Sequence, residues 1–387
     1  MKFNRLHAVG LALTAGLLAS TTALAADTIK VGAPFNVTGA LSSLDAPALN
    51  GAKLKAKEIN DAGGINGKQI ELVVYDTKTD PTVIASTASQ LVGQVPVAMG
   101  FTDSDSVLAA GPIFQQAGIP FVTPGATSPK LPEQIGDMIF LACFGDNVQA
   151  AAGADFVTKE LKGKTAYLLR DIGAEYTTLL AQYFDDAFAK DGGQIVLRDD
   201  YKTGDKTFTA QITKLKASSP MPDVLYVSAM PDEIGLIVKQ MRQAGVTQPI
   251  VGGDGYDTPL LIQVGGEASN NVYFSTHAYM AEDSTPGIQK FYKDYQAAYG
   301  TPPENAFAAL GYDTLGLIAD AIKRAGSEDP KAIRDAIAAT QGYAGVTGTI
   351  GFPPDVRVPA KSVAMIGAKD QKLFLADEVM PSYIPTP

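Results

Sequence analysis

The chain has 387 residues, of which 46% are hydrophobic, and a formal net charge of −10. Because a single hydrophobic core stops growing at about 250 to 300 residues, a chain of this length is expected to form two lobes. Its acidic surface would repel phosphate backbones and no basic stripe offsets that charge, so we do not expect nucleic-acid binding. Its two histidines and one cysteine exclude a histidine-rich metal site and enzyme mechanisms that need several histidines.

The first 25 residues have the pattern of a secretory signal peptide. Lys2 and Arg5 precede an apolar run at 8–19, and residues 23–25 have the small-x-small pattern that signal peptidase reads, which predicts cleavage after Ala25. The apolar run is shorter than the roughly 20 residues that span a bilayer. No cysteine stands at the cleavage point to accept a lipid anchor. These features predict an exported, soluble, unanchored protein of the periplasm.

Beyond the leader, strand-like and helix-like segments alternate with short turns between them. The first series predicts strands at 29–35, 69–75, 95–100 and 119–122, and helices at 46–61, 81–91 and 105–117. After residue 147 the rhythm restarts, with helices at 148–161, 176–190, 208–217, 233–244 and 258–264, and strands at 165–169, 194–201, 224–228, 250–252 and 271–276. Strands that alternate with helices form parallel sheets covered on both faces. We therefore predict an α/β fold of two doubly wound lobes.

The C-terminal part of the chain departs from this rhythm. Helical runs at 287–299, 306–324 and 330–340 are followed by a Gly- and Pro-rich stretch, and a strand pair is expected within 362–376. There is no low-complexity linker. Lobes joined without a linker are expected to be connected by several short crossings, which would restrict their relative motion to a hinge.

The scarce reactive residues have apolar surroundings. Cys143 lies between Leu141-Ala142 and Phe144, which favours a buried structural thiol over a nucleophile. His277 ends the strand-like run 271–276, and we predict a structural role for it. A Ser-His-Asp triad would depend on His277 alone.

Two strand ends in the first series are rich in small polar residues. Ligands of open parallel sheets bind beyond the carboxyl ends of the strands, where helix N-termini direct N–H groups outward. Ser104 opens the helix after the strand at 95–100, and Thr127 follows the next strand, with Gly125 allowing close backbone approach. A ligand carboxylate would suit these donors. The alternative for each residue is a turn or helix-capping role.

A strand end in the second series offers the opposite charge. Asp254 stands between glycines in Gly252-Gly253-Asp254-Gly255, where it can face a ligand cation such as an ammonium group. The alternative is that it caps the helix that begins near Thr258. Donors for an anion in one lobe and a carboxylate in the other match a zwitterion, and Tyr176 and Phe307 could add aromatic walls.

Several motifs in order along the chain match one family. They are Ile29-Lys30-Val31-Gly32, Gly51-Ala52, Glu58-Ile59-Asn60, Gly63-Gly64-Ile65-Asn66-Gly67, Tyr75-Asp76, Asp80-Pro81, Thr123-Pro124-Gly125-Ala126-Thr127, Tyr176 before a helix, Phe208 with Leu215-Lys216, and Gly311-Tyr312-Asp313. From Asp27 to about Ala376 the chain resembles the periplasmic branched-chain amino-acid binding proteins of ABC importers, which have the type I periplasmic binding fold. Each motif alone is weak, whereas the ordered set is specific.

The resemblance implies a receptor and not an enzyme, with no cofactor or metal, that delivers an amino acid to an inner-membrane permease and acts as a monomer. It implies an N-terminal lobe of residues 26–143 and 277–355 and a C-terminal lobe of residues 144–276 and 356–387. It places residues at the ligand as follows: Ser104 and Thr127 at the α-carboxylate, Gly125 and Asp254 at the α-ammonium, and Tyr176, Phe307 and Leu44 at the rest of the molecule.

Several positions depart from the family pattern. Thr79 and Asp103 stand where leucine-specific members have a disulfide, Met230 replaces a tyrosine, and Asp254 is one methylene shorter than the usual glutamate. The segment 170–176 is one residue longer. Asp103 adds a negative charge beside the candidate carboxylate site, although a helix-start residue that interacts with the helix dipole is favoured over a ligand contact.

The sequence alone does not decide which ligand is bound. Leu44, Met230 and Phe307 favour an aliphatic or branched side chain, whereas Asp103 could accept a polar or cationic one. The same fold could instead bind an aromatic or other small carboxylate that makes no use of Asp254. An exported hydrolase using Ser104 or Asp254 is disfavoured by the poverty in histidine and by the absence of a G-x-S-x-G motif near either residue. The sequence also does not decide whether a chemoreceptor is a second partner.

Overall fold

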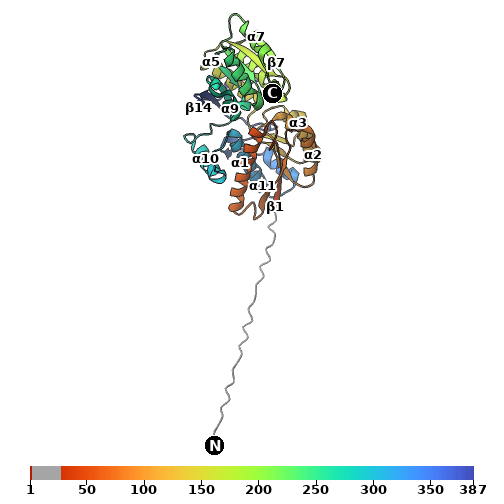
Figure 1. The fold of residues 1–387 in the computed structure, drawn as a ribbon. Helices are drawn as coiled ribbons and strands as arrows, with labels where there is room; N and C mark the ends of the chain where they lie inside the picture. Colours follow the sequence, from red (N-terminus) through yellow and green to blue (C-terminus); the bar gives the residue numbers. More distant parts are fainter. Residues whose placement is uncertain (2–27) are drawn as a thin grey trace.

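The computed structural model describes Met1 and residues 28–387, so the predicted signal peptide at 1–25 lies outside the described residues apart from Met1. Within residues 28–387 the strands form a five-stranded sheet, a seven-stranded sheet and a two-stranded hairpin. Figure 1 shows the two larger sheets in separate lobes, one containing α1, α2 and α11 and the other α5, α7 and β7. None of the helices in this part of the chain is long and apolar enough to cross a membrane.

The first lobe is built on a parallel sheet in the order β2-β1-β3-β4-β5. Its strands are β1 (Thr28–Phe35), β2 (Gln69–Asp76), β3 (Val97–Met99), β4 (Phe121–Thr123) and β5 (Ile139–Leu141). The helices that follow these strands are α1 (Ser42–Asp61), α2 (Pro81–Leu91), α3 (Ser104–Ala117) and α4 (Leu131–Ile135). Later in the chain come α10 (Pro286–Tyr299), α11 (Ala306–Ala325), α12 (Pro330–Ala338) and the hairpin β11 (Tyr343–Gly345) and β12 (Gly348–Ile350).

The second lobe contains the sheet β14-β13-β10-β9-β8-β6-β7. Its strands are β6 (Thr165–Asp171), β7 (Gln194–Tyr201), β8 (Val224–Ser228), β9 (Ile250–Gly252), β10 (Val272–Thr276), β13 (Val363–Lys369) and β14 (Lys372–Val379). Its helices are α5 (Asp146–Lys159), α6 (Glu175–Lys190), α7 (Thr209–Lys216), α8 (Pro231–Gln243) and α9 (Leu260–Gly265), with 3₁₀ turns η1 (Asp254–Tyr256) and η2 (Gly266–Ser269).

The second sheet combines parallel strands with antiparallel strands at one edge. The predicted strand pair after residue 362 exists, but β13 runs antiparallel to both β10 and β14. Strands β13 and β14 are joined by Asp370 and Gln371, which both have positive φ values, 51° and 58°. A two-residue turn with positive φ at both positions closes antiparallel hairpins and cannot connect parallel strands.

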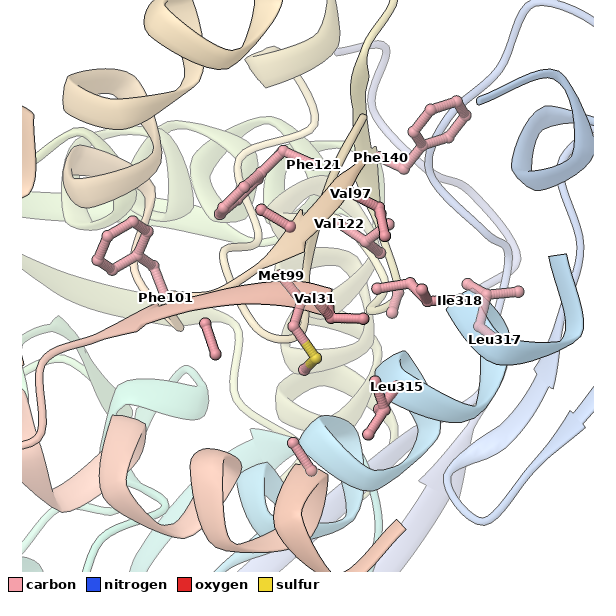
Figure 2. Packing of buried hydrophobic residues seen from close by; sticks show 14 of the residues in the cluster. Val31, Val97, Met99, Phe101, Phe121, Val122, Phe140, Leu315, Leu317 and Ile318 are labelled. Atoms are coloured by element: carbon pink, nitrogen blue, oxygen red, sulfur yellow. The ribbon is translucent and has the colours of Figure 1, made fainter. Parts of the chain in front are cut away.

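Helix α11 returns to the first lobe from far along the chain and completes its core. Figure 2 shows Val31 and Met99, on β1 and β3, beside Leu315 and Ile318 of α11. All four side chains are almost fully buried. A sheet covered by helices on both faces buries both sets of side chains, which explains why β3 and the second half of β1 are apolar without alternation.

Helices α1 and α11 approach each other unusually closely, and glycines make this possible. A Cβ atom at Gly51 would lie 1.7 Å from the carbonyl oxygen of Ala308, and one at Gly311 would lie 1.8 Å from that of Ala48. Only a residue without a Cβ fits at such contacts. Both glycines belong to the motifs that carry the family resemblance, so those motifs reflect helix packing and not ligand contact.

The structure also shifts some predicted boundaries and adds short elements. Helix α1 begins at Ser42 and not at 46, because its first turn is held by tertiary bonds: the buried Asp45 carboxylate accepts the main-chain N–H groups of Asn36 and Thr102. Helix α4, strand β5 and the hairpin β11–β12 were not predicted. Elements of three to five residues are too short to produce a periodic pattern.

We predict that Gly311→Ala destabilises the protein, because the new methyl group must push α11 away from Ala48. Overpacking of this kind typically costs about 1 to 3 kcal/mol. Urea unfolding would measure the loss. The matched control is Gly287→Ala in α10, where no atom lies within 4 Å of the added Cβ, and we expect that variant to be neutral or slightly stabilised. Equal unfolding midpoints for the two variants would contradict the close-packing account.

Candidate ligand-binding site

The predicted ligand residues meet in one cavity between the lobes. The cavity has a free volume of about 10 Å³ in this structure and is lined by Leu44, Thr102, Asp103, Ser104, Thr127, Tyr176, Met230, Asp254, Gly255 and Phe307. It lies beyond the carboxyl ends of β3, β4, β8 and β9, as expected for open parallel sheets.

Gly125 is the one predicted contact residue outside this lining. Its role in the structure is spatial, because a Cβ at this position would lie 2.7 Å from two atoms of the Phe307 ring. The glycine therefore allows the ring of Phe307 to sit over the loop after β4. Thr102 and Gly255 line the cavity although the sequence analysis did not select them, since nothing in their local pattern distinguishes them from other loop residues.

The first lobe supplies hydroxyl donors at the N-terminus of α3. Ser104 Oγ accepts the main-chain N–H of Ser128 at 3.1 Å, and Thr127 Oγ1 accepts the Nε2 of Gln149 at 3.4 Å. Since Ser104 Oγ is already an acceptor, its own hydrogen remains available to donate, whereas the Thr127 hydroxyl also has the buried Asp146 carboxyl beside it as an acceptor. Together with the positive end of the 14-residue helix α3, the Ser104 hydrogen favours an anion.

The second lobe supplies a carboxylate that is held from two sides. Asp254 is 2% exposed. Its Oδ1 accepts the Nε2 of Gln149 at 3.0 Å, and its Oδ2 lies 2.9 Å from the Nε2 of His277. The main-chain N–H of Asp254 in turn donates to Gln149 Oε1 at 3.0 Å. A carboxylate oxygen has two acceptor positions, so each oxygen can still accept a hydrogen bond from a ligand ammonium group.

This arrangement excludes the capping alternative for Asp254. Its side chain caps neither η1 nor α9. Gly253 is needed here because a Cβ at that position would lie 2.5 Å from the Tyr176 hydroxyl oxygen. That oxygen accepts the main-chain N–H of Gly255 at 3.0 Å, which leaves the phenolic hydrogen free to donate. The glycine-flanked carboxylate is thus packed directly against the tyrosine.

His277 has a role that the sequence analysis did not predict. Its ring is buried and stacks on Phe144, with centroids 3.9 Å apart. Burial lowers the pKa of His277, and the hydrogen bond with Asp254 opposes this only in part. The neutral ring therefore carries its hydrogen on Nε2 and donates it to the carboxylate. The ring is structural in its packing, as predicted, but it also positions Asp254.

Gln149 is the residue at this site that sequence reasoning missed. It lies within α5, and its Nε2 is within hydrogen-bond distance of Asp254, Asp146 and Thr127. Its Oε1 also accepts the hydroxyl of Ser275 at 2.7 Å. In the sequence it is only a glutamine in an alanine-rich helix, and this pattern does not indicate which residues its side chain contacts. Gln149 connects the carboxylate of one lobe to a hydroxyl of the other.

Asp103 acts as the N-cap of α3, as the sequence analysis favoured. Its Oδ1 accepts the main-chain N–H of Ser106 at 2.8 Å, and its Oδ2 lies 3.4 Å from the Nδ2 of Asn36. Burial, followed by the nearby charge of Asp45, raises the pKa of Asp103 to about 7. The same side chain lines the ligand cavity, so capping and ligand contact are compatible at this position.

Comparison with known proteins agrees with this geometry. Residues 28–372 match the model of the family described as periplasmic binding protein. A leucine-, isoleucine-, valine-, threonine- and alanine-binding protein of Pseudomonas aeruginosa is 29% identical over 85% of this chain and 87% of its own length. A Leu/Ile/Val-binding protein homolog of Brucella melitensis is 31% identical over 86% of this chain and 88% of its own length.

Solved structures show the same fold. The branched-chain amino acid transporter substrate-binding protein LivJ of Streptococcus pneumoniae, in complex with isoleucine, has a TM-score of 0.85 and 33% identity, covering 92% of this chain and 100% of that chain. The leucine-binding protein LivK of Thermotoga maritima has a TM-score of 0.85 and 32% identity, covering 92% and 99%.

Fold and site together define a two-lobe, non-enzymatic receptor for a small ligand. The chain belongs to the periplasmic binding protein family, as a substrate-binding protein of the branched-chain amino-acid ABC transporter type. The predicted family and fold class are confirmed, and the hydrolase alternative is not supported.

We predict that Asp103→Asn changes stability in a pH-dependent way. Because the pKa of Asp103 is raised in the folded state, the stability it contributes is present below about pH 4 and is lost as the pH rises through 7. Asparagine keeps the N-cap without this loss. The variant should match the wild type at pH 4 and exceed it at pH 8, on the order of 2 to 4 kcal/mol.

Urea unfolding at pH 4, 6 and 8 would measure this difference. The control is Asp80→Asn, at the exposed N-cap of α2, which also removes one carboxylate. A stability difference for Asp103→Asn that is the same at pH 4 and pH 8 would contradict the burial argument.

Proposed function

We propose that this protein captures an α-amino acid with an aliphatic or branched side chain between its lobes and delivers it to an inner-membrane permease. The observation that carries the proposal is the division of charge across one small cavity. Hydrogen-bond donors at Ser104 and Thr127 lie on one lobe, and the Asp254 carboxylate lies on the other. An α-carboxylate and an α-ammonium group on one carbon satisfy both at once.

The remaining walls support an aliphatic side chain. Leu44, Met230 and Phe307 line the cavity and are each at least nine-tenths buried. Burying a branched aliphatic side chain against such walls contributes roughly 1.5 to 3 kcal/mol. The relatives point the same way, since the proteins of Pseudomonas aeruginosa and Brucella melitensis are named for binding leucine, isoleucine and valine, and that of Thermotoga maritima for binding leucine.

On this proposal, ligand binding stabilises the closed arrangement of the two lobes. The N-terminal lobe is composed of residues 26–143 and 277–355, and the C-terminal lobe of residues 144–276 and 356–387. Contacts between these parts include the main-chain N–H of Glu175, which donates to Asp105, and the Nε2 of Gln134, which donates to Glu175. A ligand held by Ser104 on one lobe and Asp254 on the other adds to these contacts. The permease can then recognise the closed state by its shape. A monomer in the periplasm, released by cleavage after Ala25, fits this role.

We expect leucine, isoleucine and valine to bind the purified protein and to raise its unfolding temperature. A ligand at about 1,000 times its dissociation constant adds about 4 kcal/mol to stability. A thermal-shift panel should also include 4-methylpentanoate, which keeps the carboxylate and side chain of leucine without the amine. Binding of that acid as tight as leucine would contradict the role of Asp254 and favour the carboxylate-receptor alternative.

We predict that Asp254→Ala weakens leucine binding by about 2 to 5 kcal/mol, because the ammonium group loses its buried partner. His277→Phe keeps the stacking on Phe144 but removes the hydrogen bond to Asp254, and should weaken binding about tenfold. Calorimetry on both variants and on the double variant would measure the coupling. If His277 acts through Asp254, adding His277→Phe to Asp254→Ala should cost less than twofold. Fully additive losses would exclude a positioning role.

A further inference from the structure

A second cleft opens beside the ligand cavity, and the two share the side chains of Asp103 and Met230. This cleft has a volume of about 370 Å³, and both lobes contribute to its walls. Thr79 and Asp103 line it from the first lobe, and Met230 lines it from the second. Asp103 and Met230, which line both spaces, form the boundary between them.

Most of the charge that lines this cleft is negative. Asp103 and Asp105 face it from the first lobe, Asp232 and Glu233 face it from the second, and Lys206 is the only basic residue in the described lining. Acidic residues alone would be an ordinary solvated surface. Glu233 differs from Asp105 and Asp232, which are exposed, because it is only 2% exposed.

One oxygen of Glu233 has no partner in the part of the chain that the structure describes. Its Oε1 accepts the main-chain N–H of Gly204 at 2.8 Å, whereas its buried Oε2 makes no hydrogen bond within residues 28–387. Buried carboxylate oxygens without a partner are costly and uncommon in folded proteins. Glu233 lies in the first turn of α8, where the helix dipole favours a negative charge. This position explains why an acidic residue is found here and why it accepts the N–H of Gly204. It gives no partner to Oε2, a buried atom of a residue that lines the cleft.

We propose that this cleft is a second compartment of the ligand site, which takes the end of a long amino-acid side chain that carries an ammonium or guanidinium group, with Glu233 Oε2 as the acceptor. The proposal rests on the proposed function, since Ser104, Thr127 and Asp254 must first hold the amino-acid backbone. Met230 provides the passage, because an unbranched thioether side chain can change rotamer at little cost. Aliphatic ligands then use the inner cavity alone, and basic ligands use both spaces.

The electrostatics of the cleft support a cation over a neutral group. Burial, followed by the charge of Asp232, raises the pKa of Glu233, and burial with the charge of Asp45 raises that of Asp103. A ligand cation beside either group would favour its ionised form. Lys206 is an exposed residue of the same lining, and its charge opposes the rise in the pKa of Glu233, but it makes no hydrogen bond with Glu233 Oε2.

Calorimetry with lysine, arginine and norleucine on the purified protein tests this inference. Norleucine has the same straight carbon chain as lysine without the ε-ammonium group. We expect the wild type to bind lysine or arginine within tenfold of norleucine. Glu233→Gln should weaken binding of the basic ligand at least tenfold while changing norleucine less than twofold. Glu282→Gln, which makes the same change at an exposed residue that lines neither space, should change both ligands less than twofold.

The outcomes separate this inference from the proposed function. If norleucine or leucine binds while lysine and arginine bind more than 100-fold more weakly in the wild type, the second compartment is wrong and the amino-acid receptor stands. Equal weakening of basic and neutral ligands by Glu233→Gln also overturns it. If neither norleucine, leucine nor the basic amino acids bind, the proposed function fails and this inference fails with it. The wild-type comparison decides the matter even if Glu233→Gln does not fold.

Discussion

The buried carboxylate of Asp254 is the constraint on which the rest of this structure depends. A carboxylate removed from water is costly unless hydrogen bonds satisfy it, and two side chains from distant parts of the chain do so here. Gln149 reaches it from α5 and His277 from the segment after β10. The helix order of the second lobe, the glycines around Asp254 and the stacking of His277 on Phe144 all hold this one group in place. Each donor leaves an acceptor position of the carboxylate open toward the cavity.

The fold places groups of opposite charge on two different lobes, and this arrangement is what suits it to act as a receptor. Parallel sheets place helix N-termini at one edge, which is why the first lobe presents donors at Ser104 and Thr127. The second lobe presents an anion at the equivalent edge. On the proposed function a zwitterionic ligand contacts both edges, so its binding free energy also favours the closed arrangement of the lobes. Gln149 already links Thr127 to Asp254 across the same gap, which orients both groups before a ligand arrives.

Much of the candidate site could be predicted because its residues follow strands. Ser104, Thr127 and Asp254 come directly after buried apolar runs, and the carboxyl ends of parallel strands share one edge, so local pattern was enough to bring them together. The prediction was incomplete where a role depends on a partner elsewhere in the chain. Gln149 and Asp254 are 105 positions apart, and no periodic pattern relates them. The structural role predicted for His277 was correct for its packing and missed its hydrogen bond for the same reason.

The sequence by itself determined the alternation of strands and helices, the division into two lobes and the polar strand ends. Each of these depends on the pattern of residues that are close together in the chain. Only the tertiary structure decided how α11 returns to the first core, how β13 and β14 add antiparallel strands to the second sheet, and which side chains hold Asp254. It also decided that Glu233, which lines the second cleft, has a buried oxygen without a hydrogen-bond partner within residues 28–387. These features depend on contacts between segments far apart in the chain. The free-energy cost of burying a charged group, or of bringing two backbones close together, is decided only when those segments pack against each other.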